Sequence, residues 1–294
     1  MLHEPVMTRE VLSFLQPERG GVFVDCTVGM GGHALALLEA GATKVIGLDR
    51  DPAALRIAAA TLGGYRDRVE LVHSDYRAFA SVLESRGIDR VDGTLTDMGM
   101  SSYQLEAEGR GFSFQREDPL DMRMDTTSGP TAAELLRNAE EAEIADVIYR
   151  FGEERFSRRI ARGIMRARET APIETTAQLA AIVRKAVPRH GFSRIDPATR
   201  TFQAIRIWVN RELDGIDEFL KAVARRLKTG ARLVVITFHS LEDRIVKHTL
   251  RALAPRGGAP LRILTKKPLT PQPDELERNP RARSAKLRAA ECVL

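Results

Sequence analysis

Residues 22–51 read VFVDCTVGMGGHALALLEAGATKVIGLDRD. A β-prone run, 22–26, leads into a glycine turn at 29–33, and after a short helix-forming run a second strand, 44–49, ends in Asp49. Glycines at such a turn let the backbone approach a ligand closely. An acid at the tip of the second strand can accept hydrogen bonds from a ribose diol. The pattern therefore predicts a nucleoside-binding βαβ unit.

Asp25 closes the first strand, and its carboxylate helps to choose between two classes of ligand for this unit. Residues 29–34 satisfy the loose G-x-G-x-x-A pattern of dinucleotide-binding enzymes, so a nicotinamide enzyme is one reading. A carboxylate just before the glycines would repel a pyrophosphate, but it can accept hydrogen bonds from an ammonium group. That favours S-adenosylmethionine, whose methionine end carries an ammonium. The structural alternative is that Asp25 only caps the turn.

The composition of the chain limits the class of protein to which it can belong. The chain has 294 residues, of which 43% are hydrophobic and 29% charged, values typical of a globular α/β domain with room for an insertion. Two cysteines, Cys26 and Cys292, argue against a disulfide framework and favour a reducing cytoplasm. No apolar run approaches the length of a membrane span, so neither secretion nor membrane insertion is expected.

Charge is spread unevenly along the chain. Residues 1–100 hold 10 Lys+Arg against 14 Asp+Glu, whereas residues 150–200 hold 12 against 5 and residues 244–290 hold 12 against 3. Two basic blocks behind an acidic front half suggest a small-molecule site served by a polyanion-binding surface. Solvated helix faces are the alternative explanation, and charge alone does not exclude it.

Strands and helices alternate through the first hundred residues. Third and fourth strands are expected at 69–73 and 91–97, and this rhythm implies a parallel sheet with right-handed crossovers. Ligands of such sheets bind at the carboxyl ends of the strands. Four strand ends carry polar side chains that should converge on one crevice: Asp25, Asp49, Asp75-Tyr76 and Asp97.

The rhythm stops near Leu105 and returns late. Loops are followed by helical patterns at 142–151, 153–168 and 176–187, and no strand is convincing there, so we expect an all-helical insertion. The α/β pattern resumes in the last third of the chain. Its expected parts are a helix at 216–227, a strand at 233–239, a helix capped at Ser240, closing strands at 262–266 and 285–293, and an exposed loop at 268–280.

Longer motifs strengthen this interpretation. Besides Gly29-Met30-Gly31-Gly32-His33, they are His3-Glu4-Pro5-Val6, Asp97-Met98-Gly99-Met100-Ser101-Ser102, Arg110-Gly111-Phe112-Ser113-Phe114, Pro119-Leu120-Asp121-Met122-Arg123-Met124, Thr201-Phe202-Gln203-Ala204-Ile205-Arg206-Ile207, Phe238-His239-Ser240-Leu241-Glu242-Asp243-Arg244 and Asn279-Pro280-Arg281-Ala282-Arg283-Ser284. In this order they resemble the bacterial methyltransferase H family, which uses S-adenosylmethionine to methylate N4 of a cytosine in small-subunit ribosomal RNA.

The resemblance implies a fold and a cofactor site. The fold is α/β, a class I methyltransferase Rossmann-like sheet with an inserted all-helical domain. We place the first methyltransferase part at 1–104, the helical insertion at 105–205 and the second methyltransferase part at 206–294. S-adenosyl-L-methionine is the implied cofactor, and the residues expected to bind it are Gly31, Gly32, His33, Asp49, Tyr76, Asp97 and Gln104.

The chemistry needs hydrogen-bond acceptors for the amino group of cytosine. Amino-methyltransferases commonly carry an acid or amide followed by Pro-Pro-aromatic at the fourth strand tip, but here that slot reads Asp97-Met98-Gly99-Met100. Asp97 is the first candidate catalytic acceptor, with Ser101 and Ser102 next. Tyr103 or Phe112 could stack on the base.

Two histidines of the sequence allow a structural role as well as a functional one. His33 fits a helix cap as well as a cofactor contact, and His239 fits a core histidine as well as a functional one. No cluster has metal-ligand spacing, so no catalytic metal is expected. The resemblance implies 16S rRNA in the small ribosomal subunit as the partner. We expect the protein to be in the cytoplasm and to have no membrane partner. The oligomeric state stays open between monomer and homodimer.

Overall fold

The computed structural model describes residues 5–188, 196–254 and 260–294. The chain divides into two compact units, which are described separately. Unit 1 comprises Met1–Gly99 together with Gly215–Leu294, and unit 2 comprises Met100–Asp214. Of the quoted motifs, His3 and Glu4 lie outside the described residues.

Unit 1 is built on a seven-stranded sheet with the order β3-β2-β1-β4-β5-β7-β6. Strands β1 to β5 run parallel, while β7 pairs antiparallel with both β5 and β6. The mixed α/β fold predicted from the sequence is confirmed. The strands are β1 (Val22–Asp25), β2 (Lys44–Asp49), β3 (Val69–His73), β4 (Val91–Asp97), β5 (Leu227–Thr237), β6 (Leu261–Ile263) and β7 (Lys286–Cys292).

The strand order reverses between β1 and β4, because the chain builds outward from β1 to β3 and then returns to the other side of β1. In open parallel sheets this reversal opens a crevice at the carboxyl ends of the two strands. Asp25 ends β1 and Asp97 ends β4, so the topology brings these two carboxylates to the same place.

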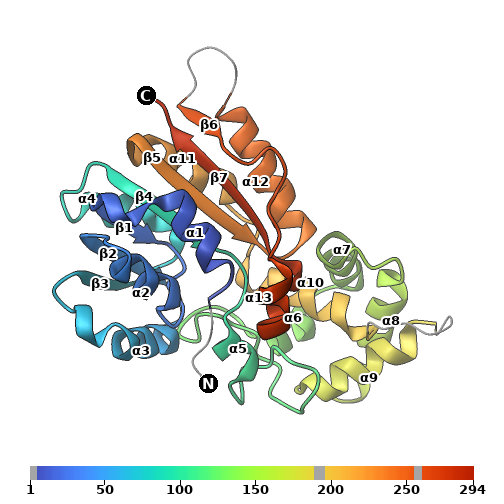
Figure 1. The fold of residues 1–294 in the computed structure, drawn as a ribbon. Coiled ribbons are helices and arrows are strands. Elements are labelled where there is room, and N and C mark those ends of the chain that lie inside the picture. Colours follow the sequence, from blue (N-terminus) through green and yellow to red (C-terminus); the bar gives the residue numbers. More distant parts are fainter. Residues whose placement is uncertain (1–4, 189–195, 255–259) are drawn as a thin grey trace. The chain divides into compact units, whose positions relative to one another are not determined.

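Helices cover the sheet on both sides (Figure 1). A core cluster joins Leu15 of α1 and Leu37 of α2 to sheet residues such as Phe23, whereas α11 contacts both α4 and α12. The helices of unit 1 are α1 (Thr8–Leu15), α2 (Gly32–Glu39), α3 (Pro52–Thr61), α4 (Phe79–Glu84), α11 (Ile216–Arg226), α12 (Ser240–Ala252) and α13 (Pro273–Arg278).

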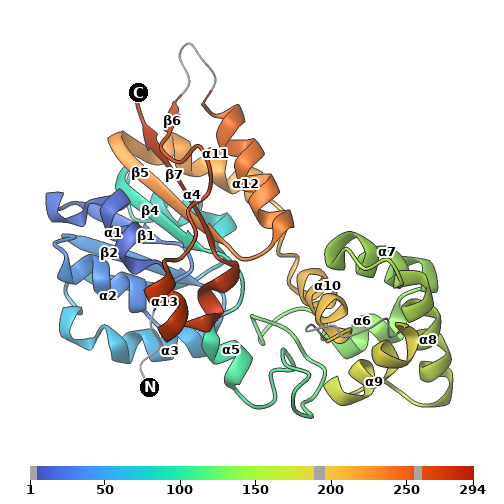
Figure 2. The same ribbon diagram turned by 45° about the vertical axis from the view of Figure 1, so that its right-hand side comes forward.

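In the part of unit 2 that the structure describes, the regular secondary structure is helical, apart from one isolated bridge between Pro119 and Thr175 (Figure 2). Its core includes Ile160 and Ile164, which lie within the second predicted helical pattern, 153–168. Its helices are α5 (Ser102–Glu106), α6 (Ala132–Asn138), α7 (Glu141–Gly152), α8 (Ser157–Thr170), α9 (Thr176–Ala186) and α10 (Ala198–Asn210).

The predicted insertion, 105–205, lies inside unit 2, but its predicted end falls within α10. Ile205 and Phe202 of this helix are buried in the core of unit 2, and Trp208 packs against the same core. Because the helix contributes to one core along its length, we propose a domain boundary after α10 rather than within it.

Two local predictions need correction. The stretch 268–280, predicted to be an exposed loop, contains α13, which starts at Pro273 with Asp274 and Glu275 in its first turn. Proline and acids are favourable there. Strand β5 begins at Leu227 rather than at 233, since an exposed portion precedes its buried one. No described helix has the length and apolar character needed to cross a membrane.

Candidate functional site

The shape of the glycine turn after β1 depends on left-handed backbone angles and on a hydrogen bond to Asp49. Gly29 and Gly31 have φ angles of 53° and 89°, in the left-handed region that favours glycine. Gly29 N donates to Asp49 Oδ2 at 2.8 Å, which joins the turn to the tip of β2. Gly31 is the N-cap of α2 and supplies no side-chain acceptor to that helix. Backbone N–H groups at the start of α2 are therefore not capped by a side chain.

Asp49 is fixed by two backbone donors. Besides Gly29, Asp51 N donates to Asp49 Oδ1 at 2.8 Å. Burial raises the pKa of Asp49 to about 6, although these two backbone hydrogen bonds act in the opposite direction. A carboxylate held in this way keeps further lone pairs for the two hydroxyls of a ribose. This geometry fits the role that the sequence predicted for Asp49.

Asp25 and Asp97 are tied together through Thr27. Thr27 N donates to Asp25 Oδ1 at 3.2 Å, and Asp97 N donates to Thr27 Oγ1 at 2.6 Å. The threonine thus joins the tips of β1 and β4 and restrains the backbones that carry both carboxylates. The sequence analysis did not single out Thr27. The available signal was its position between the first strand and the glycines, where a short side chain with a hydroxyl can bridge neighbouring strand ends.

Each of the two carboxyl groups keeps one buried oxygen without a hydrogen-bond partner among the described residues, Asp25 Oδ2 and Asp97 Oδ1. Burial, with the charge of Asp49 adding to it, raises the pKa of Asp25 to about 7. Burial also raises the pKa of Asp97 well above its usual range, and Asp25 and Glu242 reinforce the shift. Buried acceptors without donors are rare in folded proteins. A ligand that supplies N–H donors and positive charge would satisfy both.

S-adenosylmethionine meets this requirement, since its methionine end carries an ammonium group. A pyrophosphate does not, because its negative charge would meet the carboxylates of Asp25 and Asp97. The carboxylates at the tips of β1, β2 and β4 therefore fit the methionine and ribose portions of S-adenosylmethionine better than a nicotinamide dinucleotide.

Tyr76 lies just beyond β3, in a short turn capped by Asp75. Its ring packs edge-on against Phe219 with centroids 4.8 Å apart. Burial opposes ionisation of Asp75, but hydrogen bonds from Arg77 and the charge of Arg50 leave its pKa below the usual range. The carboxylate of Asp75 is thus engaged within the protein, and the cofactor contact predicted for Tyr76 stays a prediction.

His33 lies in the first turn of α2 and is buried. Its Nε2 is 2.9 Å from Val6 O, so one ring nitrogen links the N-terminal segment to the glycine turn. Pro5 borders the same place, because a Cβ on Gly32 would lie 3.1 Å from the proline ring. The ring of His33 thus has a structural contact, and its predicted contact with the cofactor stays a prediction.

The start of α12 differs from the sequence prediction. The N-cap is His239 rather than Ser240, and its Nδ1 accepts from Glu242 N at 3.4 Å. The Glu242 carboxylate in turn accepts from Phe238 N at 3.0 Å. His239 therefore has a capping role, and the buried Glu242 is a negative charge that raises the pKa of Asp97. The sequence had indicated only a cap in this region, not its electrostatic effect.

Ser101, Ser102 and Gln104 belong to unit 2, where they form the start of α5. Ser101 Oγ accepts from Gln104 N at 3.2 Å, and Gln104 Oε1 accepts from Ser101 N at 2.9 Å. This reciprocal capping box accounts for a serine and a glutamine at this spacing. The catalytic roles predicted for the serines and the cofactor contact predicted for Gln104 stay predictions.

Both basic blocks expose arginines, but the second block also contains a buried one. On α8, Arg158, Arg159, Arg162 and Arg166 are exposed. In the C-terminal block, Arg288 is buried and its Nε donates to Asp243 Oδ1 at 2.7 Å. A role for Arg288 in phosphate binding, which its place in a basic run suggests, is therefore wrong. Its charge is neutralised within unit 1.

Comparisons with known proteins show the family of this chain. A family model described as the MraW methylase family matches residues 1–293. The chain is 49% identical over 307 residues to ribosomal RNA small subunit methyltransferase H of Geotalea uraniireducens, with 99% of this chain and 98% of that protein covered. The protein of the same name from Sorangium cellulosum is 51% identical, with 99% and 91% covered, and that from Thermotoga neapolitana is 50% identical, with 99% and 96% covered. The chain belongs to the MraW methylase family.

Proposed function

We propose that this chain transfers a methyl group from S-adenosylmethionine to the N4 amino group of a cytidine in the decoding region of 16S rRNA, within the small ribosomal subunit. As a family member it is an S-adenosylmethionine-dependent rRNA methyltransferase, in line with the name that its relatives carry. Beyond family membership, we propose that the substrate is a cytidine, that its N4 atom is methylated and that it lies in the decoding region of the small subunit. The observation that carries it is the pair of orphaned carboxylate oxygens, Asp25 Oδ2 and Asp97 Oδ1.

Each carboxylate has a distinct task in this proposal. Asp25 binds the ammonium group of the cofactor, and Asp49 binds the ribose hydroxyls. Asp97 accepts a hydrogen bond from the amino group of cytosine. The cofactor supplies an electrophilic methyl group on a sulfonium centre.

Asp97 also compensates for the weak nucleophilicity of the N4 atom of cytosine, whose lone pair is delocalised into the ring. A carboxylate that accepts an N–H of the amino group shifts charge onto nitrogen and can take the proton that nitrogen loses on methylation. The surroundings of Asp97 raise its pKa, and a higher pKa makes the carboxylate a stronger base. The chain's part in the reaction is thus orientation of the amino group and acceptance of its proton.

The first test is incorporation of labelled methyl groups into unmodified small subunits. Transfer that needs S-adenosylmethionine supports the proposal, and a protein that binds subunits without transferring methyl groups would contradict it. A thermal shift with S-adenosylmethionine but not with NAD is expected in parallel. Stabilisation by NAD alone would indicate a dehydrogenase instead.

Replacing Asp49 with alanine should weaken cofactor binding by about 1–3 kcal/mol, because the ribose hydroxyls and two backbone N–H groups lose their acceptor. This corresponds to an increase in Kd of about 5- to 150-fold. Calorimetric titration measures it, with Glu39→Ala on the exposed end of α2 as the matched control. An unchanged Kd in Asp49→Ala would remove Asp49 from the site.

Neutralising Arg158, Arg159 and Arg166 with glutamine should weaken binding to 16S rRNA and make it less sensitive to salt. Each lost phosphate contact lowers the slope of log K against log salt by about 0.7–0.9. The control removes three exposed arginines of unit 1, Arg19, Arg56 and Arg66, and so changes net charge equally. Equal slopes in the two variants would show that α8 is an ordinary solvated face.

A further inference from the structure

The exposed arginines of α8 form a row. Arg158, Arg162 and Arg166 are spaced by four residues, so they share one face of the helix and rise by about 6 Å at each step. Glu169 follows three residues later on the same face. Among these arginines, Arg162 lies 3.8 Å from Glu141 in a surface ion pair, which is a weak interaction. The row therefore presents positive charge along the helix as far as Glu169.

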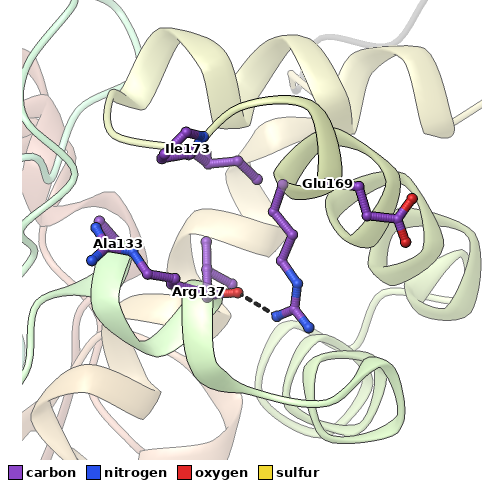
Figure 3. Close-up of a pocket in the computed structure, with 7 residues that line it drawn as sticks. Ala133, Arg137, Glu169 and Ile173 are labelled. Carbon is purple, nitrogen blue, oxygen red and sulfur yellow. Dashed lines mark hydrogen bonds between the residues drawn. The ribbon is translucent and has the colours of Figure 1, made fainter.

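A pocket of about 250 Å³ opens at the end of this row, within unit 2 (Figure 3). Its walls are mainly apolar side chains, Arg137 contributes an exposed charged group, and the carboxylate of Glu169 points away from the space between Ala133 and Ile173 (Figure 3). Arg168 Nη1 donates to Leu136 O at 2.8 Å and to Ala139 O at 2.6 Å, which fixes this wall against the end of α6. The lining residues are Ala133, Leu136, Arg137, Arg168, Glu169, Pro172 and Ile173.

We propose that this pocket binds one extruded base of the rRNA substrate, while the arginine row binds the phosphates next to it. Apolar walls suit the faces of a base, and Arg137 can donate to a carbonyl or phosphate oxygen. The row of cations favours a polyanion over a protein segment as occupant. The inference rests on the proposed function and adds a second contact with the RNA, besides the methylated nucleotide.

Ala133→Phe, which fills the pocket, tests the proposal. We expect the KM for small subunits and the Kd for 16S rRNA to rise about tenfold, the order of one stacked base. The kcat and the Kd for S-adenosylmethionine should not change. Ala181→Phe, on the exposed face of α9, is the control for a new surface aromatic ring. Arg137→Gln serves as a second variant if Ala133→Phe unfolds, because it removes the cation at the pocket, and it should raise the same two constants by a smaller factor.

Unchanged constants in the folded variants, or an equal rise in Ala181→Phe, would overturn the proposal. Photocrosslinking of rRNA that contains 4-thiouridine should join RNA to peptides from 132–138 or 168–173. A crosslink from these peptides to a ribosomal protein instead would assign the pocket to a protein partner. Because the Kd for 16S rRNA is read without methyl transfer, the pocket can fail while wild-type methylation persists, and the two proposals are tested separately.

Discussion

Replacing Asp97 with asparagine or alanine should lower the single-turnover rate of methyl transfer by about 10²- to 10³-fold at saturating cofactor. This is the range observed when a group that handles a proton or developing charge is removed from an active site. Asp97→Asn keeps the size of the side chain and one acceptor oxygen but removes the group that takes the proton. It should therefore lower the rate almost as much as Asp97→Ala does. Rapid-quench measurement with small subunits provides the rate, and an unchanged rate would contradict the catalytic role.

Thr27 provides a control that leaves the carboxylate in place. Thr27→Val removes the acceptor of Asp97 N and should reduce the rate less than Asp97→Asn does, whereas Thr27→Ser keeps the acceptor and should retain most of it. Rescue by serine separates positioning from simple loss of folding. Equal losses with valine and serine would show that the hydroxyl does not position Asp97.

Cofactor affinity should decrease when pH falls from 7.5 to 5.5, by about 20-fold from Asp25 alone. With a pKa of about 7, Asp25 is mostly ionised at the upper pH and mostly protonated at the lower one. A protonated carboxyl cannot pair with the cofactor's ammonium. Asp49, with a pKa of about 6, acts in the same direction. Asp25→Asn should bind weakly with little dependence on pH, and an affinity of the wild type that is flat over this range would contradict the assignment.

The cofactor-free protein should show the opposite trend in stability. Because burial raises the folded-state pKa of Asp25, folding binds a proton that the unfolded chain releases. The stabilisation is fully present below the unfolded value of 3.8 and is lost as pH rises through about 7. Its size is about 1.4 kcal/mol for each unit of pKa difference. Thermal unfolding with and without cofactor should therefore diverge between pH 4 and 7, the free protein losing stability as its capacity to bind increases.

The strand-tip residues were predictable because parallel strands bring their carboxyl ends to one edge. Asp25, Asp49 and Asp97 could thus be placed in one site before any contact was known. Strands β3 and β4 were also predicted with their observed ends, 69–73 and 91–97, since both are short β-prone runs. In these cases local sequence and topology agree.

The features that could not be predicted depend on contacts between residues far apart in the sequence, which a local sequence pattern does not contain. Arg288 looks like part of a basic surface until Asp243, 45 residues away, neutralises it in the interior. The bridge through Thr27 spans 70 residues to Asp97. The end that we propose for the insertion, after α10, depends on which core this helix enters, and its apolar pattern alone does not indicate that. The pocket beside α6 could not be predicted either, since it depends on how two helices pack.

The most direct test of the central claim is the identity of the methylated nucleoside. Small subunits lacking the modification are incubated with the protein and S-adenosylmethionine, and their 16S rRNA is digested and analysed by mass spectrometry. The account predicts N4-methylcytidine from one position in the decoding region, present with the wild-type protein and almost absent with Asp97→Asn. A methyl group on another atom or another base, or full yield from Asp97→Asn, would contradict it.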